Sequence, residues 1–152
     1  MKYRKLGKTG LEISEVGFGA WGIGGSTGDG ANSYGDTDDE QSKRALRCAY
    51  ENGITFYDTS DLYGYGHSEN LIRDALGEVR DKIVIASKVG FIKHGGPQDF
   101  SADHIKKSVE GSLKRLGTDY IDLYQLHSPP IEDILENREA VTALHSLKDQ
   151  GL

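Results

Sequence analysis

Apolar and polar positions along the chain alternate between two kinds of segment. Short, largely apolar runs that predict β-strands lie at residues 16–19, 55–58, 83–88 and 121–127. Each is followed, directly or after a loop, by a segment that predicts a helix, and these cover residues 38–52, 68–76, 102–116 and 136–149. In the third of them, Ile105, Val109 and Leu113 share one face. Four strand–helix units in alternation predict a parallel sheet.

The signals at the ends of these segments agree with this reading. Residues 3–6 and 11–16 flank Gly7-Lys8-Thr9-Gly10, which predicts a small β-hairpin ahead of the first unit. Ser101 is placed to cap the third helix, and Thr37 with Glu40 predicts a capping box for the first. Glycines expected to form C-terminal caps follow the four helices at positions 53, 77, 117 and 151.

Alternation alone fits both a doubly wound sheet and part of a barrel. The run Gly17-Phe18-Gly19-Ala20-Trp21-Gly22 matches the G-x-G-x-x-G dinucleotide fingerprint directly after a strand. That fingerprint requires a helix opening within the motif, so that its N-terminus meets the pyrophosphate. Residues 23–34 are rich in glycine and serine, and no helix is predicted before about residue 37. The pattern therefore argues against a Rossmann site.

Composition limits the class of protein. The length of 152 residues fits one domain, and 36% hydrophobic with 28% charged residues is typical of globular proteins. No apolar run is long enough for a membrane span and no secretory signal is visible, so we expect a cytoplasmic protein that does not engage a membrane. A net charge of -6 argues against nucleic acid as a partner.

No metal site is expected either. Cys48 is the single cysteine, so it forms no disulfide within the chain and no pair of metal ligands. It stands in a helical pattern beside Ala45 and Ala49, and we expect it to be buried. The acidic run at residues 36–40 lacks the internal glycine and spaced carboxylates of a calcium loop.

Ionisable residues end three of the predicted strands. Asp58, Lys88 and His127 each stand at a carboxyl end, which in an α/β barrel is the active-site face. A charge at a strand end commonly just reaches solvent, but three on consecutive strands ~4.8 Å apart would meet in space. The loop after Asp58 adds Tyr63, whose phenol would ordinarily titrate near ~10. A neighbouring ammonium lowers a phenol pKa, and a carboxylate keeps that ammonium charged, so these residue types predict a proton relay.

These residues lie in segments that resemble the aldo-keto reductases. The resemblance is carried by residues 56–69, which include Tyr57-Asp58-Thr59-Ser60-Asp61-Leu62-Tyr63-Gly64, by Ala86-Ser87-Lys88 and by Asp122-Leu123-Tyr124-Gln125-Leu126-His127-Ser128-Pro129. The opening residues 4–11 and the stretch 112–123 resemble the family equally. Because the similar segments occur in the expected order over essentially the whole chain, residues 1–152 are identified as the N-terminal half of an aldo-keto reductase barrel.

The resemblance implies a fold and an activity. It implies a parallel (β/α) barrel of TIM type, represented by about its first four strand–helix units with an N-terminal β-hairpin. It implies an NADPH-dependent oxidoreductase that reduces aldehydes or ketones to alcohols. In this role Tyr63 protonates the carbonyl oxygen, Lys88 lowers the phenol pKa, Asp58 orients Lys88, and His127 hydrogen-bonds the substrate oxygen.

The same resemblance implies contacts with ligands. Gly19, Ala20, Trp21 and Asp58 would lie against the nicotinamide end of NADP(H), although plain wall packing remains an alternative for Trp21. Residues 65–68 and 91–100 are candidates for the substrate rim or ordinary solvated loops.

The chain departs from the family in length. A complete barrel takes ~250 residues, and the half beyond residue 152 would bind the pyrophosphate and the 2′-phosphate of the cofactor. Half a barrel leaves two open strand edges and an open apolar face, so we expect self-association, pairing with a complementing C-terminal half, or a partly molten chain. The alternative function is a non-catalytic half-barrel that acts as a binding or assembly module.

Overall fold

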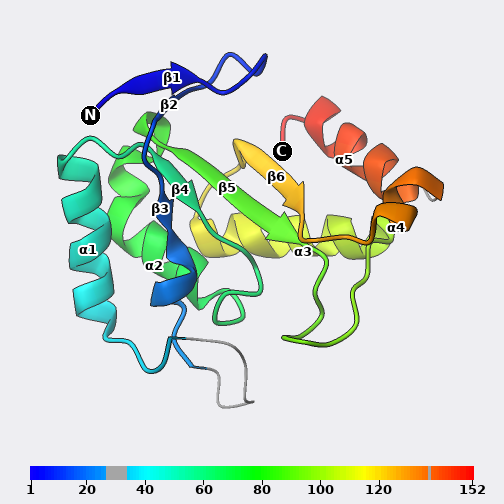
Figure 1. Ribbon diagram of the computed structural model, residues 1–152, viewed down its shortest axis with the longest axis horizontal. Helices are drawn as coiled ribbons and strands as arrows, with labels where there is room; N and C mark the ends of the chain where they lie inside the picture. Colours follow the sequence, from blue (N-terminus) through cyan, green and yellow to red (C-terminus); the bar gives the residue numbers. More distant parts are fainter. Residues whose placement is uncertain (27–33, 137) are drawn as a thin grey trace.

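The fold is an α/β arrangement around a four-stranded parallel sheet with an N-terminal hairpin, which confirms the predicted fold class (Figure 1). The computed structural model describes residues 1–26, 34–136 and 138–152. The sheet has the order β3-β4-β5-β6. Its strands are β3 (Phe18–Gly19), β4 (Phe56–Asp58), β5 (Val84–Val89) and β6 (Leu123–Leu126). They lie within the predicted apolar runs, except that β5 extends one residue further, to Val89.

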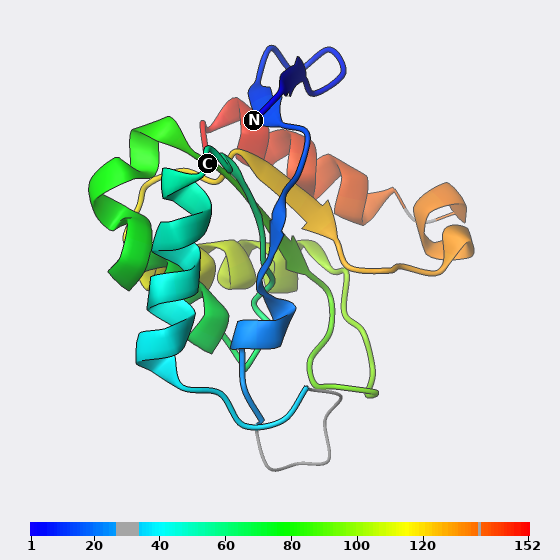
Figure 2. The ribbon, with the colours of Figure 1, turned by 60° about the vertical axis from the view of Figure 1, so that its left-hand side comes forward.

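The predicted hairpin is confirmed as β1 (Tyr3–Lys5) paired antiparallel with β2 (Glu12–Ser14). It lies at the amino ends of the parallel strands, opposite the end where the loop between β5 and the next helix lies (Figure 2). Ser14 holds it there, because its backbone N–H donates to Thr55 Oγ1 and its hydroxyl accepts from the Thr55 N–H, both at 3.0 Å. The hairpin therefore closes one end of the sheet and leaves the carboxyl ends to the longer loops.

Helices follow the strands as predicted, in the order α1 (Asp39–Glu51), α2 (His67–Leu76), α3 (Ala102–Leu116), α4 (Ile131–Glu136) and α5 (Glu139–Asp149). Two short 3₁₀ segments, η1 (Ala20–Ile23) and η2 (Gly77–Lys82), follow β3 and α2. Ser101 caps α3 as expected, since its hydroxyl accepts from the His104 N–H, and Gly117 ends that helix in the left-handed conformation.

Several details differ from the sequence-based expectations. The N-cap of α1 is Asp38, whose carboxylate accepts from the Gln41 N–H at 2.6 Å, so the predicted capping box of Thr37 and Glu40 is wrong. Glu40 pairs with Lys43 instead. Gly77 is right-handed because the chain continues directly into η2.

The last predicted helix also has different bounds. In place of one helix over 136–149, the structure has the short α4 and then α5, with residue 137 outside the described part. Cys48 is exposed rather than buried. The buried face of α1 is marked by Ser42 and Leu46, and a residue two positions after Leu46 points away from that face at ~100° per residue.

The two faces of the parallel sheet have different neighbours. Tyr57, Ile85 and Val89 belong to the main core and pack with helix residues such as Ile72 and Val109. The alternate positions, such as Val84 and Ala86, are buried outside that cluster and form the inner face. Side chains two positions apart on a strand lie on the same face. Lys88 therefore shares the inner face with Val84 and Ala86, and so does Asp58, which pairs with Ala86; both lie at the carboxyl end of that face.

The absence of a helix in the glycine-rich fingerprint is consistent with the barrel interpretation. Residues 20–23 form only the 3₁₀ segment η1, and the first α-helix among the described residues begins at Asp39. Within the described ranges, β3 and β6 each have a strand on one side only, which agrees with the two expected open edges. None of the described helices is both long and apolar enough to span a membrane.

Candidate active site

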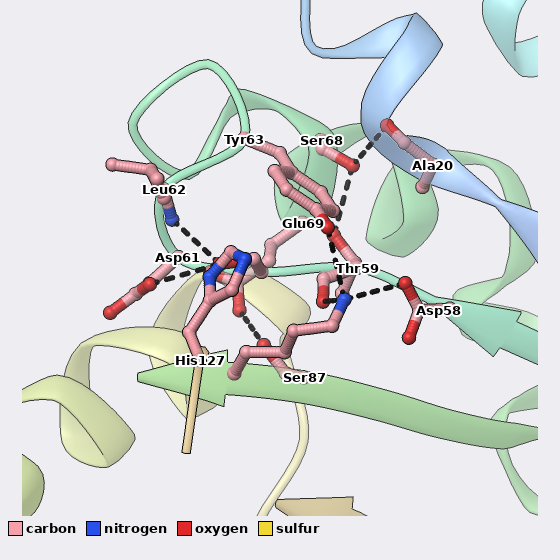
Figure 3. Close-up of polar contacts among 12 residues, drawn as sticks. Ala20, Asp58, Thr59, Asp61, Leu62, Tyr63, Ser68, Glu69, Ser87 and His127 are labelled. Carbon is pink, nitrogen blue, oxygen red and sulfur yellow. Dashed lines mark hydrogen bonds and ion pairs between the residues drawn. The ribbon is translucent and has the colours of Figure 1, made fainter. Parts of the chain in front are cut away.

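Lys88 is the centre of the candidate site. From the end of β5 its ammonium donates to Asp58 Oδ1 at 2.5 Å, to the Thr59 carbonyl oxygen at 2.9 Å and to the Tyr63 hydroxyl at 3.1 Å. An ammonium has three N–H donors, so these three acceptors use all of them. Because the phenol oxygen accepts from Lys88, the phenolic hydrogen points elsewhere and can be donated to a ligand. The structure thus brings together Asp58, Tyr63 and Lys88 (Figure 3).

His127 completes the predicted set from the adjacent strand. It follows β6 directly, and its backbone N–H donates to the Val89 carbonyl oxygen at 2.8 Å. The imidazole meets the Tyr63 ring edge-on with 5.8 Å between ring centroids, and Phe91 packs against it in the same manner at 5.0 Å. Its Nδ1 lies 3.2 Å from the buried Ser60 hydroxyl oxygen. All four predicted catalytic residues therefore lie at one edge of the sheet.

Burial changes the protonation of the imidazole. His127 is half-buried, and its pKa is lowered below the ordinary value. The main cause is removal of the imidazole from water, and the second is the positive charge of Lys88. The carboxylate of Asp58 opposes this shift, and His94 adds to it. The ring is therefore neutral at pH 7, with one nitrogen protonated and the other an acceptor.

The loop that carries Tyr63 has a backbone that only glycine tolerates at one point. Gly64 has a φ of +59°, and a Cβ there would lie 2.2 Å from the Gly24 carbonyl oxygen. The Tyr63 loop therefore packs backbone to backbone against the segment after η1. Gly66 ends the loop with a φ of +92° under the Arg115 side chain. These close approaches fix the position from which the phenol reaches Lys88.

Buried hydroxyls tie the loop to the sheet. The Ser68 hydroxyl donates to the Ala20 carbonyl oxygen at 3.0 Å and lies 2.9 Å from Thr59 Oγ1 (Figure 3). Below it, the fully buried Glu69 accepts from Ser87 at 2.7 Å and from Arg115 Nε at 2.6 Å. Sequence reasoning missed Thr59 and Ser60, although two polar residues directly after a buried strand are a signal for such contacts.

The residues expected to bind the cofactor lie beside this cluster. Gly19 is exposed, and a Cβ on it would have no atom within 4 Å. The Trp21 side chain is 36% exposed, with 6.5 Å between its ring centroid and that of Tyr63. Ala20 is fully buried, so the solvent-exposed surface here comes from Gly19 and Trp21 together with the half-buried Asp58. An open glycine flanked by an exposed indole next to Tyr63 fits a flat aromatic ring such as nicotinamide.

The expected substrate rim divides into two parts. Ser68 is fully buried with its hydroxyl bonded to the Ala20 carbonyl oxygen, and His67 Nε2 lies 2.8 Å from Asp39 Oδ1, so both side chains already have partners within the fold. Tyr65 is exposed and packs edge-on against His94, with 5.7 Å between ring centroids. Phe91, in the loop after β5, packs against His127. Tyr65 and this loop therefore remain the candidates for the substrate rim. Within the described ranges, no group of three or more His, Cys, Asp or Glu residues is arranged to hold a metal ion.

Comparison with known proteins identifies the family of this arrangement. The model of the "Aldo/keto reductase family" matches residues 15–152. The chain is 39% identical to the aldo-keto reductase YhdN of Bacillus subtilis, over 95% of this chain and 44% of that protein. It is 34% identical to a probable voltage-gated potassium channel subunit beta of Arabidopsis thaliana, over 99% of this chain and 44% of that protein.

Solved structures agree. The holo form of aldo-keto reductase AKR11C1 from Bacillus halodurans superimposes with a TM-score of 0.84 at 38% identity, over 99% of this chain and 47% of that one. The chain thus spans about half the length of the relatives that it matches. With the family model covering nearly all of the sequence, the chain belongs to the aldo/keto reductase family.

Proposed function

We propose that this chain supplies the catalytic residues of an NADPH-dependent reductase of aldehydes or ketones. The observation that carries the proposal is the bridge that Lys88 makes between Asp58 and Tyr63 on the inner, carboxyl-end edge of the sheet. A cytoplasmic location belongs to the same proposal.

The cofactor, when bound, supplies a hydride to the carbonyl carbon. Gly19, Trp21 and Asp58 would hold its nicotinamide end, because Gly19 is exposed, Trp21 is 36% exposed beside the Tyr63 ring, and Asp58 is half-buried next to Lys88. Negative charge develops on the carbonyl oxygen as its carbon is reduced, and Tyr63 gives that oxygen its proton. The phenolate left behind is stabilised by the ammonium of Lys88, which already donates to the phenol oxygen.

Asp58 and His127 have supporting roles in this proposal. Asp58 holds the ammonium in place beside the phenol, because it accepts a hydrogen bond from one of the three N–H donors of Lys88. His127 stands edge-on to the Tyr63 ring, within reach of a substrate oxygen that contacts the phenol. A neutral imidazole there positions the oxygen without adding a second positive charge beside Lys88.

The test is transfer of an isotope from the cofactor. NADPH that carries deuterium at the transferable position is incubated with the chain and a reactive aldehyde, and the alcohol is examined by mass spectrometry. We expect deuterium on the carbinol carbon, and a rate that falls by at least about 100-fold in Lys88→Met. Lys82→Met, at an exposed lysine in η2, is the matched control and keeps the rate. Equal rates in both variants would contradict the proposal.

A second candidate is a non-catalytic half-barrel that acts as a binding or assembly module. It is favoured by the two open strand edges and by a hollow of about 540 Å³ between β6 and α5, lined by Leu123, Leu144 and Leu152 among others. A channel beta subunit among the relatives shows that the family name alone does not decide between the two functions.

Self-association or a complementing C-terminal half would cover this surface. Light scattering on the 16.6 kDa chain separates these outcomes, since self-association doubles the mass and a complementing half binds only when added. A module that neither binds NADPH nor transfers deuterium would favour the second candidate.

A further inference from the structure

The side-chain amide of Gln98 binds two consecutive carbonyl oxygens beside the candidate site. Its Nε2 donates to the carbonyl oxygen of His127 at 2.8 Å and to that of Ser128 at 3.1 Å. A carboxamide nitrogen has two hydrogens, which is one for each oxygen. Carbonyl oxygens only accept, so the amide has to face them with its nitrogen. One side chain from the loop after β5 therefore fixes two peptide groups directly after β6.

The turn that contains these carbonyl oxygens is unfavourable without support. Ser128 has a φ of +52°, and within the described ranges Ser128 and Tyr65 are the two residues other than glycine with a positive φ. A residue with a Cβ adopts this left-handed conformation only at a cost in free energy. Ser128 also precedes Pro129, and a residue before proline is ordinarily extended. The backbone directly after His127 is therefore strained, and the two hydrogen bonds from Gln98 offset that strain.

The backbone of Gln98 is itself held in place. Gln98 pairs with Phe91 in an antiparallel bridge, and the loop is closed by the Asp99 N–H, which donates to the Gly90 carbonyl oxygen at 2.7 Å. The Phe91 ring, from the other side of the bridge, packs edge-on against the imidazole of His127, with 5.0 Å between ring centroids. The same loop therefore contacts His127 twice, at its ring and at its backbone.

The sheet holds only one side of His127. Its backbone N–H donates to the Val89 carbonyl oxygen of β5 at 2.8 Å, but β6 ends one residue earlier, at Leu126. The carbonyl oxygen of His127 instead accepts from the Gln98 side chain. With both of its peptide groups fixed, His127 presents its imidazole to the Tyr63 ring, 5.8 Å away between centroids.

We infer that Gln98 is a positioning residue that keeps the imidazole of His127 beside Tyr63 by holding the strained turn at Ser128. It is not a catalytic residue, because its side chain donates to backbone oxygens and not to the phenol. The inference rests on the proposed function only where His127 is said to contact a substrate oxygen.

The pKa of the imidazole reports where the ring lies. It is lowered mainly by burial and next by the charge of Lys88 from β5, while Asp58 from β4 opposes the shift and His94 from the loop after β5 adds to it. When the turn is released, the ring gains contact with water and moves away from Lys88. The pKa of His127 should then rise towards its ordinary value of about 6.5.

The test is an NMR titration of His127 without cofactor, with the ring signals assigned by means of His127→Gln. Gln98→Met keeps the length of the side chain but removes both donors, and we expect it to raise the pKa of His127. Adding Ser128→Gly removes the cost of the positive φ and should return the pKa towards the wild-type value. Gln150→Met is the matched control, since Gln150 donates to the Ser146 carbonyl oxygen at the end of α5, and it should keep the wild-type pKa.

Two titration results would overturn the inference. One is an unchanged pKa in Gln98→Met. The other is a raised pKa that Ser128→Gly does not reverse, because Gln98 would then not act through the turn. A Gln98→Met chain that folds only when Ser128→Gly is also present supports the inference. A chain that folds in neither background contradicts it, because Gln98 would then support the fold as a whole.

Kinetics separates this inference from the proposed function. If both hold, Gln98→Met should lower kcat for aldehyde reduction by up to about 100-fold, through misplacement of the imidazole. In a chain that already carries His127→Gln, the same substitution should change kcat by less than about twofold. Equal losses in the two backgrounds would contradict the positioning role. A wild type that reduces no aldehyde would contradict the proposed function alone, and the titration would still decide the role of Gln98.

Discussion

The sheet carries an ion pair at each end, and the two pairs differ in what else they contact. At the amino end, Arg80 donates to Asp122 at 2.7 Å and also to the carbonyl oxygens of Tyr120 and Ile83. At the carboxyl end, Lys88 donates to Asp58, to a carbonyl oxygen and to the phenol of Tyr63. Both cations are largely buried, at 13% and 15% exposure.

The difference lies in the remaining partners. Asp122 accepts both from Arg80 and from the backbone N–H of Ile85, so this pair joins fixed groups of the fold to each other. The Lys88 pair instead ends on a hydroxyl that has a proton to give. A buried ion pair is therefore not by itself a sign of catalysis. A titratable third partner at the carboxyl end of the strands is what separates the two.

The largest expected effect is a difference in the free energy of unfolding when the cation of each ion pair is removed. Arg80→Met leaves Asp122, only 11% exposed, without its cation, and should lower the free energy of unfolding by about 3–5 kcal/mol. Lys88→Met leaves Asp58, which is 36% exposed and keeps contact with water, so the loss should stay below about 1 kcal/mol. Urea unfolding of both variants measures this. Equal losses would mean that the carboxyl-end pair is structural too.

The half-buried carboxylate of Asp61 sharpens the contrast. Asp61 accepts no bond from an Arg or Lys side chain within the described residues, and its pKa is raised from 3.8 to about 6. The folded state then binds more protons than the unfolded state between these values, so stability falls as pH rises from about 4 to about 6. Asp61→Asn should therefore stabilise the fold at pH 8 by up to about 3 kcal/mol and leave it unchanged near pH 3.

The control for this prediction is Asp81→Asn, at an exposed carboxylate in η2, which should change stability by less than about 0.5 kcal/mol at either pH. Urea unfolding at the two pH values is again the measurement. A loss of stability in Asp61→Asn at pH 8 would show that the charge of Asp61 holds the fold together.

The smallest expected effect is that of replacing Asp58, the carboxylate that pairs with Lys88. Asp58→Asn keeps an oxygen that accepts from Lys88 but loses the charge, so we expect carbonyl reduction to slow by about tenfold, or about 1.4 kcal/mol. Steady-state kinetics measures the change, and circular dichroism checks that the fold is kept. A rate equal to the wild type would remove Asp58 from its orienting role.

The fold, and the meeting of Asp58, Lys88 and His127 at one edge of the sheet, could be predicted because their signals are local. Strands buried on both faces have continuous apolar sequences, so Lys88 and His127 stand out at their ends, and their occurrence on neighbouring strands is what indicates a shared site. The parallel sheet then brings successive carboxyl ends together without further information. Tyr63 was singled out by its residue type in the loop after Asp58, and the family resemblance then gave it the role of proton donor.

Features without a clear local pattern could not be predicted, and contacts between segments that are distant in the sequence are the main case. The contact between the Ser60 hydroxyl and His127 Nδ1, for example, joins residues 67 positions apart in the sequence, so no local pattern indicates it. Cys48 was expected inside because Ala45 and Ala49 look apolar, yet small side chains do not mark a buried face as Leu46 does. The short α4 has too few residues to show a helical period.

The most direct test of the central claim is the rate of NADPH-dependent aldehyde reduction in Tyr63→Phe, which removes one oxygen from the Lys88 bridge and leaves the ring in place. The matched control is Tyr120→Phe, where the ring under Arg80 at the opposite end loses the same atom. The account predicts a loss of about 10² to 10⁴-fold in the first variant and no change in the second. A Tyr63→Phe variant that reduces the aldehyde at the wild-type rate would contradict it.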